Sequence, residues 1–344
     1  MSWLPPDDEV EDDAEYGDYD ESDVRIRPNP KGNRPRTKTR PEHEGALEGR
    51  ILSVDRGRYT VMLGEDTDQE RVITTTRARE LRKDAIVTGD RVDVVGDTTG
   101  DDGTLGRIVR IRPRTTLLRR SADDTDQVER VIVANADQLM IVIAAADPEP
   151  RARLVDRYLV AAYDAGIAPV IVVTKTDLAD PDPFLANFAG LEVPVVRSAK
   201  GAWPIAELAP ILDGHTTVAV GHSGVGKSTL VNALVPGTDR AVGVVNAVTG
   251  RGRHTSSSTV SLRVPTGGWI IDTPGVRSFG LGHVDTANVL RAFTDLVEIA
   301  AGCPRGCTHL ADAPDCALDE AVADGRLRAD RVEDFRRLLV SVNG

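Results

Sequence analysis

Residues 216–235 read TTVAVGHSGVGKSTLVNALV, and this stretch decides the fold. Its centre, GHSGVGKS, is a complete match to the pattern G-x-x-x-x-G-K-[ST]. The apolar run before the match predicts a strand and the run after it predicts a helix, which is the context that a phosphate-binding loop requires. In such a loop backbone N–H groups point at phosphate, a lysine neutralises the outer phosphates and a hydroxyl ligates magnesium. The stretch therefore predicts a nucleoside triphosphate site.

This predicted phosphate loop supplies most of the expected binding residues. Lys227 is expected to neutralise phosphate charge and to act in catalysis, and Ser228 is expected to hold magnesium. The nucleotide contacts are expected from Gly221, His222, Ser223, Gly224, Val225, Gly226, Lys227, Ser228 and Thr229.

A second motif, DTPG, follows the apolar run GGWII. Here Asp272 is expected to hold magnesium together with Ser228, and Gly275 is expected to sense the terminal phosphate. A D-x-x-G pattern alone is weak evidence. It becomes informative because it lies roughly fifty residues after the phosphate loop.

The base-recognition signal is TKTD, which ends the apolar run APVIVV. Asp177 can accept both the N1–H and the exocyclic amine of guanine, an edge that adenine does not present, while the stem of Lys175 lies along the base. Thr174 stands where the usual consensus has Asn, and we expect it to loosen a supporting contact. The segment SAK is expected to back the base through Ser198, Ala199 and Lys200. These motifs predict guanine rather than adenine.

Lysine usage gives an independent check, because 36 of the 42 basic residues are Arg and six are Lys. Beyond residue 44 the lysines are Lys83, Lys175, Lys200 and Lys227, and three of these four stand inside the motifs above. A slim ammonium group on an aliphatic stem suits these positions better than a guanidinium fork.

The order of the motifs is unusual, since TKTD and SAK precede GHSGVGKS and DTPG. Ordinary GTPases begin with the phosphate loop, so the order predicts a circular permutation. Such a rearrangement is tolerated because the ends of a compact domain often lie close together. From Val131 onward, apolar runs alternate with helical stretches, which predicts a parallel sheet covered on both faces, with ligands beyond the carboxyl ends of its strands.

Length and composition limit the class of protein. The chain has 344 residues, 40% of them hydrophobic, which is enough for two or three domains. The longest apolar run, Leu139–Ala146, is far shorter than the about 20 residues of a membrane-spanning helix, and the acidic N-terminus does not resemble a signal peptide. We therefore expect a cytoplasmic protein without a membrane partner.

The net charge of −12 is unevenly distributed. Residues 1–23 hold eleven acidic and no basic residues, whereas residues 24–40 hold seven basic and no acidic ones, which leaves the rest near −8. Residues 1–44 lack apolar periodicity and are expected to be a disordered arm. Its basic half fits an RNA contact and a solubilising tail equally well. Any nucleic-acid surface of the remaining chain must be local.

Residues 45–120 contain short β-type runs broken by turn residues, which predict a small antiparallel barrel. Its last strand and exit carry six arginines and no acid: Arg107, Arg110, Arg112, Arg114, Arg119 and Arg120. Such a stripe is typical of an oligonucleotide-binding barrel, and equally of a strand edge that is kept soluble.

The three cysteines all lie between residues 303 and 316, so a metal site in a reducing compartment is favoured over a disulfide framework. Three thiolates and one imidazole suit tetrahedral zinc, and the expected ligands are Cys303, Cys307, His309 and Cys316. A structural zinc ion is expected because no open coordination position is evident. Free thiols are the alternative.

The barrel, the permuted motifs and the cysteine-rich segment together resemble the RsgA (YjeQ) family of GTPases over roughly residues 45–340. The resemblance extends to GRGRHTSSS (250–258), which looks like the first switch of the family, and to VRSFGL (276–281). It implies an OB-fold barrel, GTP hydrolysis stimulated by the small ribosomal subunit, contact with its rRNA, and a role in late maturation of that subunit. The family cysteine spacing is C-x4-C-x-H-x5-C, whereas this chain has C-x3-C-x-H-x6-C with the same total span.

Hydrolysis without a partner is expected to be slow, because Val276 stands where many GTPases have a glutamine that orients water. His254 is the candidate substitute, since imidazole can orient or deprotonate water, and the alternative is that it contacts RNA or phosphate. Thr255 or a neighbouring hydroxyl is expected to give the switch contact to magnesium.

We therefore expect a disordered arm (1–44), an OB-fold-like barrel (45–120), a circularly permuted α/β GTPase domain (121–282) and a zinc-binding C-terminal domain (283–344) in a monomer that uses GTP, GDP, Mg2+ and Zn2+. Two alternative functions stay open. One is a non-enzymatic RNA-binding checkpoint in which GTP is a conformational ligand. The other is an ATP-using enzyme, against which TKTD argues.

Overall fold

Five short strands between residues 47 and 111 close into a barrel in the computed structural model. The strands are β1 (Leu47–Asp55), β2 (Arg58–Leu63), β3 (Arg71–Arg77), β4 (Arg91–Gly96) and β5 (Gly106–Ile111). They follow the order β1-β2-β3-β5-β4, and a β1–β4 pairing closes the ring. The expected antiparallel barrel is confirmed except that β3 and β5 run parallel. Inward residues such as Ile51, Val61 and Ile108 fill its interior, since alternate strand positions face one side.

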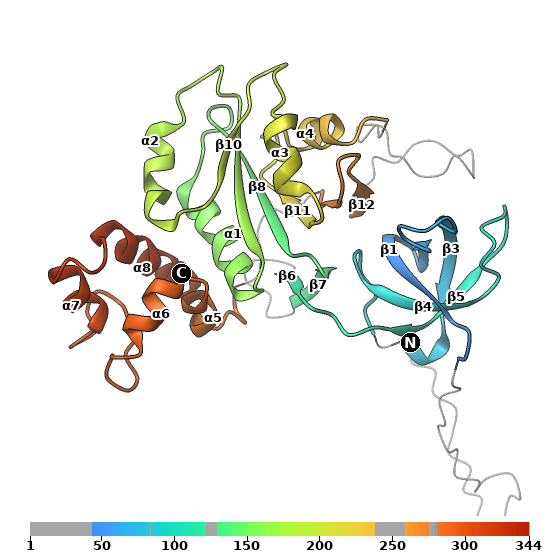
Figure 1. Ribbon diagram of the computed structural model, residues 1–344, viewed down its shortest axis with the longest axis horizontal. Helices are drawn as coiled ribbons and strands as arrows, with labels where there is room; N and C mark the ends of the chain where they lie inside the picture. The colour runs from blue at the N-terminus through green and yellow to red at the C-terminus, as the bar shows by residue number, and fades with distance from the viewer. Residues whose placement is uncertain are drawn as a thin grey trace, which may run out of the picture. The chain divides into compact units, whose positions relative to one another are not determined.

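The structure describes residues 43–82, 84–121, 129–237, 259–274, 279 and 281–343, and within them residues from His43 onward belong to one unit. A hairpin of β6 (Leu117–Ser121) and β7 (Glu129–Ala134) leads from the barrel to the following sheet (Figure 1). The hairpin therefore straddles the boundary that we expect at residue 120.

A parallel sheet forms the centre of the core and confirms the expectation of an α/β fold. Its strands are β8 (Gln138–Ala144), β9 (Ala168–Thr174), β10 (Val195–Arg197), β11 (Thr216–Val220) and β13 (Trp269–Asp272). Their order is β10-β9-β8-β11-β13, and all four neighbouring pairs are parallel. The antiparallel strand β12 (Val260–Arg263) follows at the edge.

Helices cover both faces of this sheet. The helical elements are η2 (Arg79–Leu81) in the barrel, and α1 (Ala152–Asp164), α2 (Asp182–Leu185), η3 (Ala186–Leu191), α3 (Ile205–Leu212) and α4 (Lys227–Leu234) in the core. Alternation along β8 separates two apolar layers, because Leu139 and Ile141 pack toward α1 whereas Met140 and Val142 pack toward α3 and α4. The sheet therefore has a helical layer on each face, as expected.

The C-terminal segment is helical, as expected, and packs on the α1 side. It contains α5 (Thr286–Arg291), α6 (Thr294–Ala300), α7 (Ala317–Ala323) and α8 (Ala329–Asn343). Arg337 of α8 binds Asp156 of α1 at 3.1 Å and Asp334 at 2.5 Å, and Phe335 is fully buried. Of the helices in the described ranges, none has the length and apolar character to cross a bilayer.

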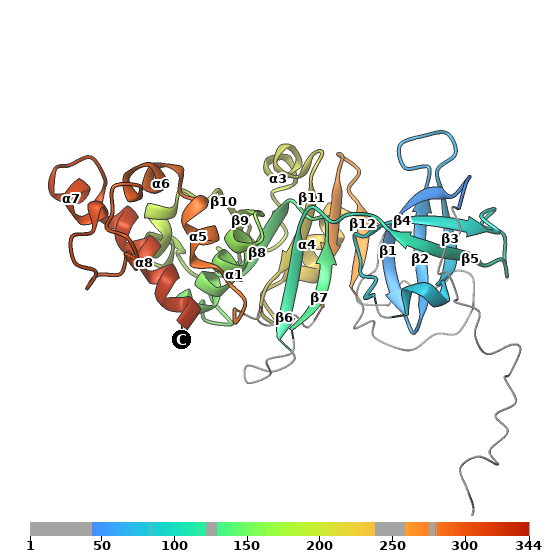
Figure 2. The same cartoon turned by 90° about the horizontal axis from the view of Figure 1, so that it is seen from below.

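The core sheet continues into the barrel. Strand β12 pairs with β1, so that eleven strands form one hydrogen-bonded sheet. Figure 2 shows β12 beside β1.

Candidate functional site

The predicted nucleotide motifs lie at one edge of the parallel sheet. TKTD begins with the last residue of β9, SAK follows β10, the phosphate loop follows β11, and DTPG begins with the last residue of β13. Because these four strands are parallel, their carboxyl ends share one edge, which is where ligands bind in open α/β sheets. We call these loops the nucleotide rim.

The phosphate loop wraps tightly between β11 and α4. Gly221 has φ +156°, and a Cβ atom there would lie 2.4 Å from the carbonyl oxygen of Val142, so only glycine fits. Gly226 has φ +91° and is the N-cap of α4, which begins at Lys227. The first N–H groups of a helix lack intrahelical partners and attract anions. The loop thus has the backbone form of a phosphate site.

Lys227 and Asp272 meet at the rim. Their side chains form an ion pair in which the carboxylate is almost fully buried. The pair joins the phosphate loop to the end of β13 across neighbouring strands. The lysine expected to bind the phosphates and the carboxylate expected to bind magnesium are therefore neighbours.

The base-recognition loops also converge. Lys200 donates its backbone N–H to Asp177 Oδ1 at 2.9 Å, and Thr176 donates its own to the carbonyl oxygen of Ser198 at 3.2 Å. Lys175 adopts φ +57°, an uncommon value for a residue with a side chain, and its Nζ contacts the carbonyl oxygen of Asp147.

Thr174 links the base loops to the phosphate loop. Its hydroxyl is buried within hydrogen-bonding distance of the carbonyl oxygen of Val225 and 3.1 Å from that of Ile143. The replacement of Asn by Thr therefore retains a direct contact between the two loops. The loop that begins at Thr174 is therefore joined to the phosphate loop by a hydrogen bond.

The rim also contains an unsatisfied polar group, which fits a bound ligand. The Ser198 hydroxyl is 1% exposed and has no hydrogen-bond partner among the described residues. A buried hydroxyl without a partner costs free energy, so such groups are rare unless a ligand or water binds there. Three expected site residues, His254, Thr255 and Gly275, lie outside the described residues, as does Val276.

The predicted zinc ligands also come together. The candidate ligand atoms of Cys303, Cys307, His309 and Cys316 all lie within 4.8 Å of one another. The Cys303 Sγ lies 3.6 Å from His309 Nδ1 and 3.9 Å from the Cys316 Sγ. Tetrahedral zinc with bonds of about 2.0–2.3 Å places its ligands roughly 3.4–3.8 Å apart, so the donor set and the spacing fit a structural zinc ion. The shifted cysteine spacing therefore does not separate the ligands.

Burial sets the protonation of this cluster before metal binds. Burial is the main cause that raises the pKa of the Cys303 thiol to about 11. Burial, and secondly the charge of Arg336, lowers the pKa of His309, which favours the neutral imidazole that metals require. Zinc binding would therefore release the proton of the Cys303 thiol, whereas His309 would bind in its neutral form.

Half of the arginine stripe is paired with carboxylates of the barrel itself. Arg114 binds the fully buried Asp90 at 2.6 Å, and Arg112 binds Asp93 at 2.7 Å. Arg110 lies 3.3 Å from the same Asp93. Three of the six stripe arginines therefore pair with carboxylates of the barrel, although the side chains of Arg110 and Arg112 are also exposed to solvent.

Sequence patterns gave no indication of an ionic cluster between barrel and core whose centre, Arg50 and Glu65, is buried. It consists of Arg50, Glu65, Arg91, Arg263 and Trp269, and we call it the junction cluster. No motif marks these residues, and the GEDTD segment that contains Glu65 has the composition of a turn. The burial of Phe279, in the VRSFGL segment, was also not predicted. This residue is fully buried against Tyr158, with ring centroids 5.7 Å apart.

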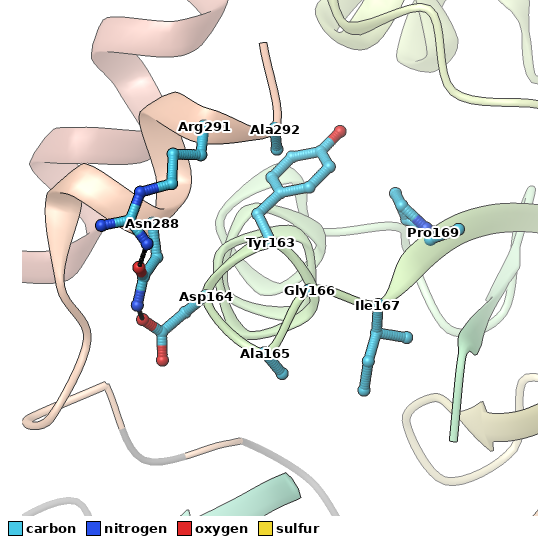
Figure 3. Close-up of a pocket in the computed structure, with 10 residues that line it drawn as sticks. Tyr163, Asp164, Ala165, Gly166, Ile167, Pro169, Asn288, Arg291 and Ala292 are labelled. Carbon is cyan, nitrogen blue, oxygen red and sulfur yellow. Dashed lines mark hydrogen bonds between the residues drawn. The ribbon is translucent and has the colours of Figure 1, made fainter. Parts of the chain in front are cut away.

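A cavity of about 590 Å3 lies far from the rim, at the edge where β9 begins. Figure 3 shows Asn288 between Arg291, which donates to its Oδ1 at 2.6 Å, and Asp164, which accepts from its Nδ2 at 2.9 Å. Asp164 also accepts the backbone N–H of Asp285. These groups satisfy one another, so the cavity belongs to the packing of α5 on α1.

Comparison with known proteins agrees with this geometry. A protein of Pseudomonas syringae named "Small ribosomal subunit biogenesis GTPase RsgA" is 42% identical over 266 residues, which span 75% of each chain. A Pseudomonas aeruginosa protein of the same name is 41% identical, over 75% of this chain and 76% of its own. The crystal structure of YjeQ from Thermotoga maritima matches 87% of this chain and 99% of its own with a TM-score of 0.63 and 26% identity.

A second solved structure, YloQ, described as a circularly permuted GTPase, matches 88% of this chain and 96% of its own with a TM-score of 0.62 and 26% identity. The permuted order predicted from the motifs is therefore confirmed. The family model described as RsgA GTPase matches residues 111–282, which contain all the rim motifs. This chain belongs to the RsgA GTPase family and is a GTP-hydrolysing enzyme.

Proposed function

We propose that this GTPase acts in late maturation of the small ribosomal subunit and that the subunit stimulates its hydrolysis of GTP. One observation carries the proposal. Relatives that are 41–42% identical over 75% of the chain are named for biogenesis of that subunit. We further infer that the protein is cytoplasmic, because its partner would be the ribosomal subunit. We also infer that it is a monomer.

The decisive experiment is GTP turnover titrated with isolated small and large ribosomal subunits. Small subunits should raise the rate and saturate, and large subunits should leave it unchanged. Equal responses to both subunits, or none, would contradict the proposal. Single-turnover assays with and without small subunits separate this proposal from the alternative in which GTP acts as a conformational ligand and hydrolysis is incidental, because that alternative predicts no acceleration of phosphate release by the subunit.

The rim residues have distinct proposed roles. Lys227 would neutralise the outer phosphates, and the carboxylate of Asp177 would accept the two N–H donors of guanine. Ser228 and Asp272 would hold the magnesium ion, which offsets phosphate charge when bound. The close Lys227–Asp272 pair supports this assignment, because a phosphate bound by Lys227 and a metal ion bound by Asp272 would lie next to each other.

We propose His254 as the residue that orients or deprotonates the attacking water, and Thr255 as the switch contact to magnesium. The side chain of Val276 cannot orient water, so another group must supply that role. His254→Ala should lower the subunit-stimulated single-turnover rate by about 10²-fold. The affinity for GDP should not change, because the base and phosphate contacts remain. An unaltered stimulated rate would remove His254 from catalysis.

For the rRNA contact we propose the outer face of the barrel where β2, β3 and β5 lie side by side. Arg58 is opposite Thr76, and Thr76 is opposite Arg107, so the two arginines share a face across three strands. Both arginines are exposed, and no ion pair joins either of them to a residue within the described ranges. Exposed arginines near the same strand ends extend the charge: Arg56, Arg77, Arg79 and Arg82.

The salt dependence of subunit binding tests this surface. Replacing Arg58 and Arg107 with alanine should weaken binding and reduce the slope of log affinity against log salt by about one for each lost phosphate contact. Arg112→Ala is the matched control, because Arg112 is engaged with Asp93. An unchanged slope in the double variant would exclude this face.

We propose that Cys303, Cys307, His309 and Cys316 hold one structural zinc ion. Metal analysis of the purified chain should give one zinc per chain, and Cys307→Ala should lose it. Removal of zinc should lower the melting temperature, because binding free energy of a structural zinc is folding free energy. A full chain that stays metal-free after zinc is added during refolding would contradict this assignment.

A further inference from the structure

A line of residues that lie opposite one another across the continuous sheet connects the barrel to the nucleotide rim. Ser53 of β1 lies opposite Val260 of β12, and Val260 lies opposite Asp272 of β13. Asp272 in turn lies opposite Ala219, two residues before the phosphate loop. Neighbouring strands keep a nearly fixed spacing of about 4.8 Å through their hydrogen bonds. A displacement of the β13 backbone at Asp272 is therefore resisted, through β12, by a strand of the barrel.

A side chain at the other end of the same strand is held by the barrel. Trp269 begins β13, three residues before Asp272, and is 6% exposed. Its Nε1 donates to Glu65 Oε1 at 2.6 Å. The guanidinium carbons of Arg50 and Arg263 lie 5.0 and 5.7 Å from its ring centroid. The barrel therefore contacts both the edge and the face of the indole, which fixes its orientation.

Glu65 is the centre of the junction cluster. Its carboxylate lies 3.2 Å from Arg50 Nε and also contacts Arg91. Burial alone would raise the pKa of Glu65, but the charges of Arg50 and Arg91 outweigh it and hold the pKa below its ordinary value. Arg50 also donates to the Thr216 hydroxyl, at the start of β11, at 3.3 Å. A buried charge network of this kind tolerates little displacement, because separating its members leaves uncompensated charge.

A further contact holds the rim end of the β12–β13 hairpin. Thr88 of the barrel donates its hydroxyl to the carbonyl oxygen of Thr259 at 3.3 Å. Thr259 directly follows Ser258 in the sequence, the last residue of the segment that resembles the first switch. The barrel thus binds the hairpin at Thr259 and Val260 near the rim, and at Trp269 at the opposite end.

We propose that Glu65 and Trp269 are positioning residues that link the barrel to the nucleotide site through strand β13. Exchange of GDP for GTP near Asp272 changes the hydrogen-exchange rates of barrel amides, and a ligand bound to the barrel changes the affinity for nucleotide. The two effects reflect one coupling free energy, because coupling between two binding sites is reciprocal. The proposal rests on the guanine-nucleotide site and does not depend on the identity of the barrel's partner.

Hydrogen exchange of the full chain, with GDP and with a non-hydrolysable GTP analogue, tests the linkage. In the parent chain, barrel amides in β1 and in residues 86–92 should exchange at rates that differ by at least about fivefold between the two nucleotides. Trp269→Phe keeps an aromatic face but removes the donor to Glu65, and Glu65→Gln removes the charge. Both should lose most of the difference in the barrel while residues 221–230 keep theirs.

Glu70→Gln is the matched control. Glu70 lies in the same part of the barrel and binds the partly exposed Arg263 at 2.5 Å, whereas the indole N–H of Trp269 is donated to Glu65. It should behave like the parent chain. The linkage is overturned if the parent barrel shows no difference between nucleotides, or if both variants retain it in full. Loss of the difference at residues 221–230 in the variants also overturns it, since the substitutions would then act on the nucleotide site itself.

Discussion

The nucleotide rim and the junction cluster both depend on buried charge, but their polar groups are satisfied differently. At the rim, the Ser198 hydroxyl has no partner among the described residues. In the junction cluster, Glu65 receives donors from Arg50, Arg91 and Trp269. Buried groups that lack partners indicate a site for a ligand, whereas saturated groups indicate a contact within the fold.

The difference predicts opposite consequences of substitution. A change at the rim should mainly reduce activity, since the chief lost partner is the ligand; substitutions of Lys227 also remove the ion pair of the buried Asp272 carboxylate and should lower stability as well. A change in the junction cluster should reduce stability, since it leaves a buried charge without its partner. Four substitutions test this contrast, in order of decreasing effect.

Lys227→Ala should produce the largest effect. Removing a charge that faces the phosphates should lower GTP turnover by about 10²–10³-fold, as for other electrostatic groups aimed at a transition state. The measurement is phosphate release with saturating magnesium, accompanied by a melting curve. Lys227→Arg is a useful comparison, because a guanidinium keeps the charge but not the shape. Turnover of the alanine variant within twofold of the parent would show that Lys227 does not act in GTP hydrolysis.

Glu65→Ala should mainly affect stability. It leaves Arg50, which is 6% exposed, without a carboxylate, and should lower the free energy of unfolding by about 3 kcal/mol. Urea denaturation measures this value. Glu70→Ala removes a more exposed carboxylate and should cost under about 1 kcal/mol. Equal losses of unfolding free energy in the two variants would show that Glu65 stabilises the fold no more than an exposed carboxylate does.

Asp177→Asn should change base preference. The amide loses the charge that accepts two N–H groups of guanine, which should weaken GTP binding by about 10²-fold and favour xanthine nucleotides. Competition between the two nucleotides in an equilibrium binding assay gives the ratio. If the preference for guanine were unaltered, Asp177 would not be the base-reading residue.

Thr174→Val should have the smallest effect. The substitution removes the hydroxyl near the carbonyl oxygens of Ile143 and Val225, a loss of about 1 kcal/mol, and should weaken GDP binding about fivefold. Dissociation of a fluorescent GDP derivative measures the change. Thr174→Ser keeps the hydroxyl and should resemble the parent. A Val variant that also matches the parent would show that this contact does not support the site.

The sequence alone determined the parts whose chemistry is contained in short segments. Glycine spacing fixed the phosphate loop, because Gly221 has no room for a side chain, and the end of each apolar run placed TKTD and DTPG at a strand end. The four zinc donors lie within fourteen residues of chain, so a local loop brings them together despite the altered spacing. The domain boundaries, and the roles of His254 and Thr255, stay predictions.

Only the tertiary structure decided the contacts between distant residues. Glu65 and Trp269 are 204 positions apart, and no local pattern relates them. The arginine stripe was visible in the sequence, but the acids that neutralise it come from neighbouring strands, as Asp93 does for Arg112. Local propensity and motif spacing specify elements and loops, whereas pairing across the sheet depends on register, which the whole fold sets.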